Sequence, residues 1–228
     1  VGLAAGAVTL LALPFLARTR RGEPISLPGP RPSLRAALAR RPVRRGLALA
    51  AIHVTAQKTS IGLLGPFFVD QGWSLAQVGL LNGAGAIGLG VVGAAVGGGM
   101  VRRFGIRAVL VGAAVVQAGV LTLIGLHAAT GALPGAALVG LALTGGSLVM
   151  ATGFVALYAQ FMRWSDPRQA GVDFTLFQSA DAAVSMATGL AAGVLAGALG
   201  YAAFFWIAAG LALLAVPALF WATRAEAG

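Results

Sequence analysis

The distribution of arginine among long apolar stretches constrains this chain more than any other feature of its sequence. All but one of the 16 basic residues in the 228-residue chain are arginines, and apolar stretches separate them into four groups. These groups are 18–45, 102–107, 163–168 and Arg224. The alternate connections, around Asp70, His127 and Gly200, contain no arginine. Short arginine-rich loops stay on the cytoplasmic side of a membrane, because guanidinium groups resist transfer across the bilayer. The alternation therefore predicts a multi-pass membrane protein with its arginines inside.

Composition argues against a soluble fold for this chain. Hydrophobic residues make up 58% of the sequence, charged residues make up 10%, and the mean hydropathy is +0.89. A soluble domain carries about a quarter charged residues. The net charge of +10 then reflects the cytoplasmic loops, so no nucleic-acid partner is expected. The chain has no cysteine, which rules out disulfides and thiolate metal sites, and we expect no cofactor and no metal ion.

Seven stretches are long and apolar enough to span a bilayer, which takes about 20 residues for about 30 Å of hydrocarbon. They are 1–17, 46–68, 75–99, 108–128, 136–161, 173–199 and 201–222. The first stretch is short and begins at Val1 without a methionine, so we expect it to be the end of a helix from a longer chain. The predicted fold is an all-α polytopic membrane protein of seven transmembrane helices, with 223–228 as a cytoplasmic tail.

Residues 18–45 form the one long connection, and we expect a basic cytoplasmic linker there. The segment contains five prolines, and Ser33 precedes a short stretch in which Leu34 and Leu38 lie four residues apart. Serine is a favoured helix cap, and this leucine spacing places both side chains on one helix face. A short amphipathic helix over 33–41 on the membrane surface fits this pattern, and so does a solvated linker.

The last six predicted spans divide into two triplets, 46–128 and 136–222, each with an arginine-containing loop after its second span. This spacing is typical of an internal three-helix repeat. Two series of glycines spaced by four residues also predict close packing between helices. They are Gly93 with Gly97, and Gly189 with Gly193 and Gly197.

A basic linker followed by two three-helix triplets resembles the C-terminal half of a major facilitator superfamily transporter, preceded by the end of its sixth helix. The family motif in the loop after the second helix of a bundle is G-x-x-x-D-R-x-G-R-R, and residues 98–107 read GGMVRRFGIR. The matching positions are Gly98, Arg103, Gly105 and Arg107. Arg102 replaces the acidic residue, and Ile106 replaces the first of the paired arginines. The resemblance implies that 46–222 form a six-helix bundle and that this loop takes part in gating.

Two stretches resemble a narrower group within the superfamily, the muropeptide-permease-like branch and its siderophore importers of the RhtX/FptX type. The stretches are 58–79, and 173–181 together with 200–205. This resemblance implies proton-coupled import of an iron–siderophore across the cytoplasmic (inner) membrane by alternating access, with a cytoplasmic C-terminus. An anhydromuropeptide, a drug or another organic solute is the alternative cargo. The implied partners are the solute, protons, the lipid bilayer and an N-terminal bundle of the same protein.

Lys58 and Asp181 are the charged residues that the predicted spans place near the middle of the membrane. Lys58 lies twelve residues beyond Gly46, about 18 Å into its helix, and Asp181 lies ten residues beyond Gly171, about 15 Å in. A lone ammonium group at such a depth costs about 2.5–3.5 kcal/mol on insertion scales. The resemblance to the superfamily implies that the first and fifth helices of the bundle, which carry Lys58 and Asp181, are neighbours, so we expect the two residues to pair. The pair either lines a central cavity, where a proton or the substrate breaks it, or is a static link between two helices.

Other polar side chains are predicted to share a cavity with this pair. His53 and Gln57 lie about 40° apart on one face of the same helix, and His53 could relay protons or form an interhelical hydrogen bond. A second stripe runs along the sixth span with i, i+3, i+4, i+7, i+11 spacing. It consists of Phe174, Phe177, Gln178, Asp181 and Ser185. This mixture of rings and hydrogen-bonding groups suits an aromatic chelate or an amidated sugar-peptide.

Other polar residues are expected to have structural roles. Asn82 and Gln117 are predicted to form interhelical hydrogen bonds. Thr144, Ser147 and Thr152, together with Gly145 and Gly146, are expected to loosen the fifth span, so that this helix can bend during gating.

A seven-helix receptor or retinal protein is the main alternative class, and it fits the sequence less well. Its Schiff-base lysine usually lies in the last span, whereas Lys58 lies in the second. A membrane-embedded enzyme is also disfavoured. The histidines His53 and His127 lie in different spans without an H-x-x-x-H pair, and no serine lies in a G-x-S-x-G motif. We therefore expect a transporter and not an enzyme.

Overall fold

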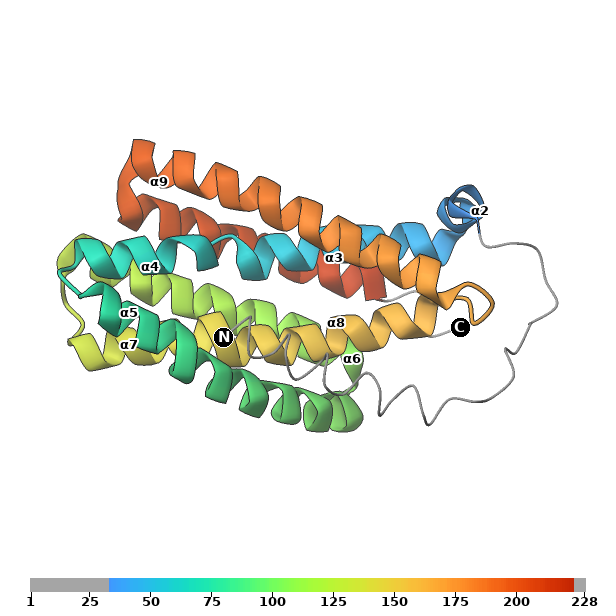
Figure 1. Ribbon diagram of the computed structural model, residues 1–228, viewed down its shortest axis with the longest axis horizontal. Coiled ribbons are helices and arrows are strands. Elements are labelled where there is room, and N and C mark those ends of the chain that lie inside the picture. Colours follow the sequence, from blue (N-terminus) through green and yellow to red (C-terminus); the bar gives the residue numbers. More distant parts are fainter. Residues whose placement is uncertain (1–32, 224–228) are drawn as a thin grey trace, which may run out of the picture. The chain divides into compact units, whose positions relative to one another are not determined.

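The computed structural model describes residues 33–223, and this part of the chain is a bundle of helices without a strand (Figure 1). Most elements are α-helices, and two short segments, η1 and η2, have π-helical hydrogen bonding. The elements are α2 (Leu34–Ala39), α3 (Arg41–Lys58), α4 (Ile61–Asp70), α5 (Leu75–Leu80), η1 (Leu81–Gly85), α6 (Ala86–Thr130), α7 (Gly135–Leu143), η2 (Thr144–Val149), α8 (Met150–Trp164) and α9 (Ala170–Thr223).

Four helical stretches in the described residues, one of them interrupted at Thr59 and Ser60, are long and apolar enough to cross a membrane. They are Arg41–Asp70, Leu75–Thr130, Gly135–Trp164 and Ala170–Thr223, with 30, 56, 30 and 54 residues. Even the 30-residue stretches reach about 45 Å at 1.5 Å per residue, more than the hydrocarbon thickness of a bilayer. The chain is therefore an all-α membrane protein. The predicted span 1–17, most of the linker 18–45 and the tail beyond Thr223 lie outside the described residues.

The two longest stretches each reverse direction at a glycine. Gly105 has φ 81° and ψ 161°, and Gly200 has φ 79° and ψ 166°. An L-residue with a side chain rarely adopts a positive φ, so glycine is the residue that permits both reversals. Figure 1 shows the two arms of α9 lying side by side. The result is six arms, and each contains one of the six spans predicted within 46–222. The arms are 41–70, 75–104, 106–130, 135–164, 170–199 and 201–223.

The connections that contain arginine gather at one end of the bundle, and those without arginine gather at the other. At the first end α2 lies beside the turn between α8 and α9, and the Ser33 amide donates to Gln169 Oε1 at 3.4 Å (Figure 1). At the opposite end the Tyr201 hydroxyl donates to Asp70 Oδ2 at 2.6 Å. The rings of Phe67 and His127 also meet there, with centroids 6.4 Å apart. The connections that alternate along the sequence therefore lie at opposite ends of the bundle, with the arginines at one end.

Glycine allows the first arm of α6 to pack closely on η2 and α8, as predicted for Gly93 and Gly97. A Cβ atom on Gly93 would lie 2.5 Å from the Leu148 carbonyl oxygen. Thr152 Oγ1 donates to the Gly93 carbonyl at 3.0 Å across the same contact. The second glycine series, at 189, 193 and 197, does not show the predicted packing. These glycines are exposed, and a Cβ on any of them would meet no atom within 4 Å.

The helix predicted in the linker forms, but it is shorter than expected. α2 spans Leu34–Ala39, with the Ser33 hydroxyl accepting from the Ala36 amide at 3.5 Å. The backbone is extended at Arg40, and α3 begins directly afterwards. α3 starts five residues before the predicted span because Pro42 fits its first turn and Val43 is buried in the core.

Candidate functional site

Lys58 and Asp181 form an ion pair between α3 and the first arm of α9. Lys58 Nζ lies 2.6 Å from Asp181 Oδ2. The side chains are 22% and 11% exposed, so most of both charged groups is shielded from solvent. The contact expected from the sequence is therefore confirmed. Its part in binding a substrate or a proton remains a prediction.

Lys58 lies where the helical backbone of its membrane-spanning arm is interrupted. Lys58 is the last residue of the 18-residue helix α3, and it is close to the middle of the 30-residue stretch Arg41–Asp70. The helix stops at Thr59 and Ser60 and resumes as α4 at Ile61. Asp181 supplies the counter-charge at this depth, with its Oδ2 atom 2.6 Å from Lys58 Nζ.

Two aromatic residues of α8 form one wall of the site. Lys58 Nζ lies 4.8 Å from the centroid of the Phe154 ring, within the range of a cation–π interaction. Phe154 stacks on Tyr158 with centroids 5.5 Å apart, and the Tyr158 hydroxyl is 3.5 Å from Gln178 Nε2. Sequence reasoning did not connect Phe154 with this site. The i, i+4 spacing of the two rings, which places them on one helix face, was the available signal.

Several buried polar atoms around the ion pair have no hydrogen-bond partner in the described part of the chain. They are both ring nitrogens of His53, both amide atoms of Gln57, Gln178 Oε1, Asp181 Oδ1 and Ser185 Oγ. Buried polar atoms are normally hydrogen-bonded, and leaving one unpaired costs about 1–3 kcal/mol. So many unpaired groups beside one ion pair give the site unused capacity to donate and accept hydrogen bonds.

His53 and Gln57 share one buried face of α3, as the sequence predicted. Neither residue is exposed to solvent. The His53 ring contacts Phe154 edge-on, with centroids 5.9 Å apart, and it packs against Gly153 of the same helix. Phe154 therefore touches both His53 and Lys58, and it joins the histidine to the ion pair.

The predicted stripe on α9 divides into a part near the site and a part in the core. Gln178 and Ser185 lie near Asp181 on the same helix, and the half-buried Phe174 meets Tyr158 with centroids 6.0 Å apart. Phe177 was expected to line a cavity, and that expectation is wrong. Its ring stacks on Phe161 at 4.5 Å, has no exposed surface and fills the space beside a glycine of α3, Gly46. Core packing fixes this residue because glycine at 46 leaves room for one ring.

The four residues of the predicted gating loop have different environments. Gly105 supplies the positive φ at which α6 reverses. Arg107 donates from Nη2 to the Thr223 carbonyl at 2.7 Å and from Nε to the Thr223 hydroxyl at 3.2 Å, so it caps the end of α9. Arg103 is exposed, with its guanidinium 5.5 Å from the centroid of the Phe104 ring. A Cβ on Gly98 would meet no atom within 4 Å, and nothing in the structure explains that glycine. The gating role itself remains a prediction.

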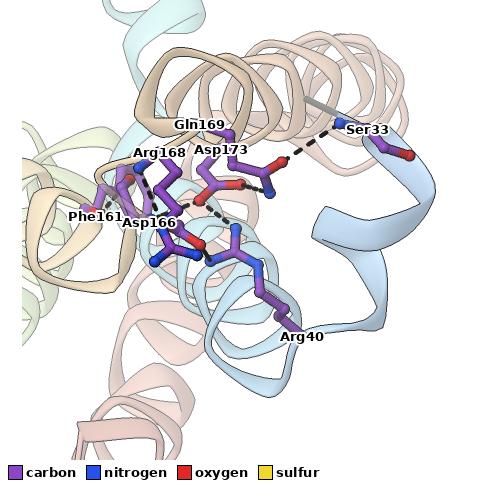
Figure 2. Close-up of polar contacts among 8 residues, drawn as sticks. Ser33, Arg40, Phe161, Asp166, Arg168, Gln169 and Asp173 are labelled. Atoms are coloured by element: carbon purple, nitrogen blue, oxygen red, sulfur yellow. Dashed lines mark hydrogen bonds and ion pairs between the residues drawn. The ribbon is translucent and has the colours of Figure 1, made fainter. Parts of the chain in front are cut away.

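A second polar cluster lies at the arginine-containing end, and Figure 2 shows its side chains converging on Asp173. This carboxylate is fully buried, and it accepts from the Arg40 guanidinium, from the Asp166 amide at 2.8 Å and from Gln169 Nε2 at 3.2 Å. Arg40 also lies 3.8 Å from the Asp166 carboxylate. The cluster joins the start of α3 to the turn between α8 and α9. Sequence reasoning missed it, because Arg40 looks like any other arginine of a basic segment.

No protein-family model matches this chain, and no curated protein matches it. Within residues 33–223, no group of three or more histidine, aspartate and glutamate side chains is placed to hold a metal ion. The interpretation of the site therefore depends on the geometry of the ion pair and its neighbours.

Proposed function

We propose that this chain is the C-terminal bundle of a secondary active transporter that imports an organic solute together with protons. The observation that carries the proposal is the Lys58–Asp181 pair, held at 2.6 Å near the middle of a membrane-spanning arm, beside buried polar atoms that have no hydrogen-bond partner in the described part of the chain. Ionisable residues within membrane spans commonly mark ion, proton or substrate pathways.

A purely structural role explains the pair less well. A buried ion pair contributes little net stability, because desolvation of both groups offsets most of their attraction. A static link would also favour neighbours whose hydrogen bonds are complete, whereas Asp181 Oδ1, Gln178 Oε1 and Ser185 Oγ have no hydrogen-bond partner among residues 33–223. These atoms can instead bind a polar solute.

The proposed mechanism uses the pair as a switch. In the observed state the Lys58 ammonium neutralises Asp181. A proton on Asp181 would remove the attraction and release Lys58 toward an anionic or carbonyl group of the solute. In alternating access, this bundle would rock against an N-terminal bundle of the same protein, with the solute bound near the midplane. His53, which touches the same phenylalanine as Lys58, is the nearest candidate proton relay.

The resemblance described above leads us to propose an iron–siderophore as the cargo, with an anhydromuropeptide or a drug-like solute as the alternative. We also propose that the arginine-containing end faces the cytoplasm, as the positive-inside rule requires in the cytoplasmic (inner) membrane. The rings of Phe154 and Tyr158 and the amide of Gln178 suit an aromatic chelate or an amidated sugar-peptide.

Uptake by iron-starved cells tests the proposed activity. Cells with and without the gene that encodes this chain would be given radiolabelled iron bound to several siderophores. We expect uptake of at least one chelate to depend on the gene and to collapse when a protonophore removes the proton gradient. Unchanged uptake of every chelate in the deletion strain would contradict a siderophore cargo, and the same comparison with labelled anhydromuropeptide would then decide between the alternatives.

A further inference from the structure

A cavity of about 340 Å³ lies between α4, the α5–η1 segment and the α7–η2 segment. Its volume falls in the range of small-molecule sites, which is about 300–1,000 Å³. Phe68 and Val78 belong to its lining, and both residues lie close to the arginine-free turn between α4 and α5. The residues of the Lys58–Asp181 site do not line it.

Three helices are interrupted where they border this cavity. α3 and α4 are separated at Thr59 and Ser60, and Ile61, the next residue, lines the cavity. The π-helical segment η1 contributes Asn82, and the π-helical segment η2 contributes Ser147. π-Helical turns inside α-helices occur frequently at functional sites. Irregular backbone at membrane depth is tolerated where it is buried in protein or lines a cavity. Three independent interruptions around one cavity indicate a binding site.

The side chains define the chemistry that the cavity can accept. The described lining residues include no charged group, and most are aliphatic or aromatic. Asn82 and Ser147 are the side chains in this lining that carry hydrogen-bonding groups. Neither makes a side-chain hydrogen bond to another described residue, so the interhelical bond expected for Asn82 is not observed. The two groups can therefore donate to and accept from a ligand.

We propose that this cavity binds a neutral, mainly apolar small molecule with an aromatic or branched body and one hydrogen-bonding group. The body fills the space between Ile61, Phe68 and Val78, while the polar group bonds to Asn82 and Ser147. A charged ligand is disfavoured because the wall offers no counter-charge. The site is distinct from the Lys58–Asp181 pair, and it is tested by binding alone, so it stands or falls independently of the proposed transport activity.

Photolabelling of the purified protein in lipid nanodiscs tests this site. The probe is 4-hydroxybenzophenone in a mildly acidic buffer, in which its hydroxyl stays protonated and the molecule is neutral. It has two rings, the hydroxyl and a ketone, and the ketone bonds covalently to nearby C–H groups on irradiation. 4-Benzylphenol, which has the same rings and hydroxyl but no ketone and is not photoreactive, is the competitor. We expect saturable labelling of peptides within 61–86 and 135–149, and we expect the competitor to suppress it.

Two variants and one matched control make the result specific. Ala142 lines the cavity and is buried, so Ala142→Phe should fill the space and abolish saturable labelling. Ala136 is exposed on the same helix and is not part of the lining, so Ala136→Phe should leave labelling unchanged. Asn82→Leu, a change at an exposed position, should weaken competition about fivefold, the equivalent of one net hydrogen bond.

The proposal is overturned by any of three results. Labelling could fail to saturate and spread over exposed apolar positions such as Leu190 and Leu214. Saturable labelling could lie outside the two expected peptides. Competition could also be unchanged in Asn82→Leu, which keeps the experiment decisive even if Ala142→Phe does not fold.

Discussion

Asp166 and Asp173 lie near the same guanidinium group, that of Arg40, but their surroundings differ. The Asp173 side chain has no exposed surface and accepts from three donors, whereas the Asp166 side chain is 36% exposed and lies 3.8 Å from Arg40. An exposed ion pair contributes about 0–1 kcal/mol, whereas removing one partner of a buried pair costs about 3–5 kcal/mol. Burial should therefore decide which carboxylate stabilises the cluster in Figure 2.

This difference predicts unequal effects of the same amide substitution. Asp173→Asn should lower the free energy of unfolding by about 3 kcal/mol, because Arg40 loses its buried counter-charge. Asp166→Asn should change it by about 0.5 kcal/mol or less. Thermal unfolding of both variants in the same detergent measures the difference. Equal midpoints for the two variants would show that Asp173 is not the carboxylate that holds Arg40.

At the residue scale, the sequence allowed a contact to be predicted where a charged residue lies in an apolar stretch, because such a residue requires a partner of opposite charge. Lys58 is the only lysine and lies in an apolar stretch, so it needed a partner, and Asp181 was the carboxylate at a similar depth. Arg40 offered no such signal, because it is one of nine arginines in 18–45. Phe154 was overlooked because a phenylalanine in a membrane span has many possible neighbours and no need for a particular one.

At the scale of helices, the packing of α6 on η2 and α8 depends on glycine at defined positions. At Gly93 an added Cβ would meet the Leu148 carbonyl oxygen at 2.5 Å, a contact with backbone that cannot move without shifting a helix. Gly88 lies on the same arm, and a Cβ there would meet no atom within 4 Å. The two positions therefore separate the effect of packing from the effect of helix propensity.

We expect Gly93→Ala to lower the unfolding temperature and Gly88→Ala to leave it unchanged or raise it. Alanine favours a helix over glycine by about 1 kcal/mol at both positions, but overpacking costs about 1–3 kcal/mol where the helices touch. Thermal unfolding of the two purified variants, compared with the unmodified chain, gives the measurement. A Gly93→Ala protein as stable as Gly88→Ala would contradict the close contact between the two helices.

The bounds of the helices could be predicted to within a few residues, because a run of apolar residues must cover the thickness of the bilayer. The positions at which these helices are interrupted could not be predicted. η1 and η2 depend on how each helix meets its neighbours, and η2 coincides with the sequence Thr144–Ser147 that was expected only to loosen its span. The glycine series at 189, 193 and 197 is the opposite case, in which the sequence predicted a contact that the structure does not show. The spacing is typical of helix packing, but no described helix packs against the face of α9 that carries these glycines.

At the scale of the whole molecule, the fold places the ion pair between two ends of the bundle that differ in charge. Arginine-containing and arginine-free connections lie at opposite ends of the bundle, and the Lys58–Asp181 pair lies between them. The sequence predicts which connections lie at each end, because arginine-containing and arginine-free connections alternate between successive spans. It does not predict the cavity between α4, α5–η1 and α7–η2, because this cavity forms where three helix interruptions from separate segments meet.

The central claim, that the ion pair operates in transport, is tested most directly by separating its effect on folding from its effect on uptake. Lys58→Ala leaves Asp181 buried without a counter-charge, and we expect a low yield of folded protein. Lys58→Ala combined with Asp181→Asn removes both charges, and we expect the yield to recover. A double variant that expresses no better than Lys58→Ala would show that the two charges are not coupled.

The decisive measurement is uptake of the labelled iron–siderophore by cells that produce this double variant at the level of the unmodified protein. The account predicts uptake no higher than in the gene-deletion strain, because a folded bundle without the pair lacks both the carboxylate that takes up the proton and the ammonium that binds the solute. Uptake at the unmodified rate would contradict it, and would leave the Lys58–Asp181 pair as a link that only positions α3 against α9.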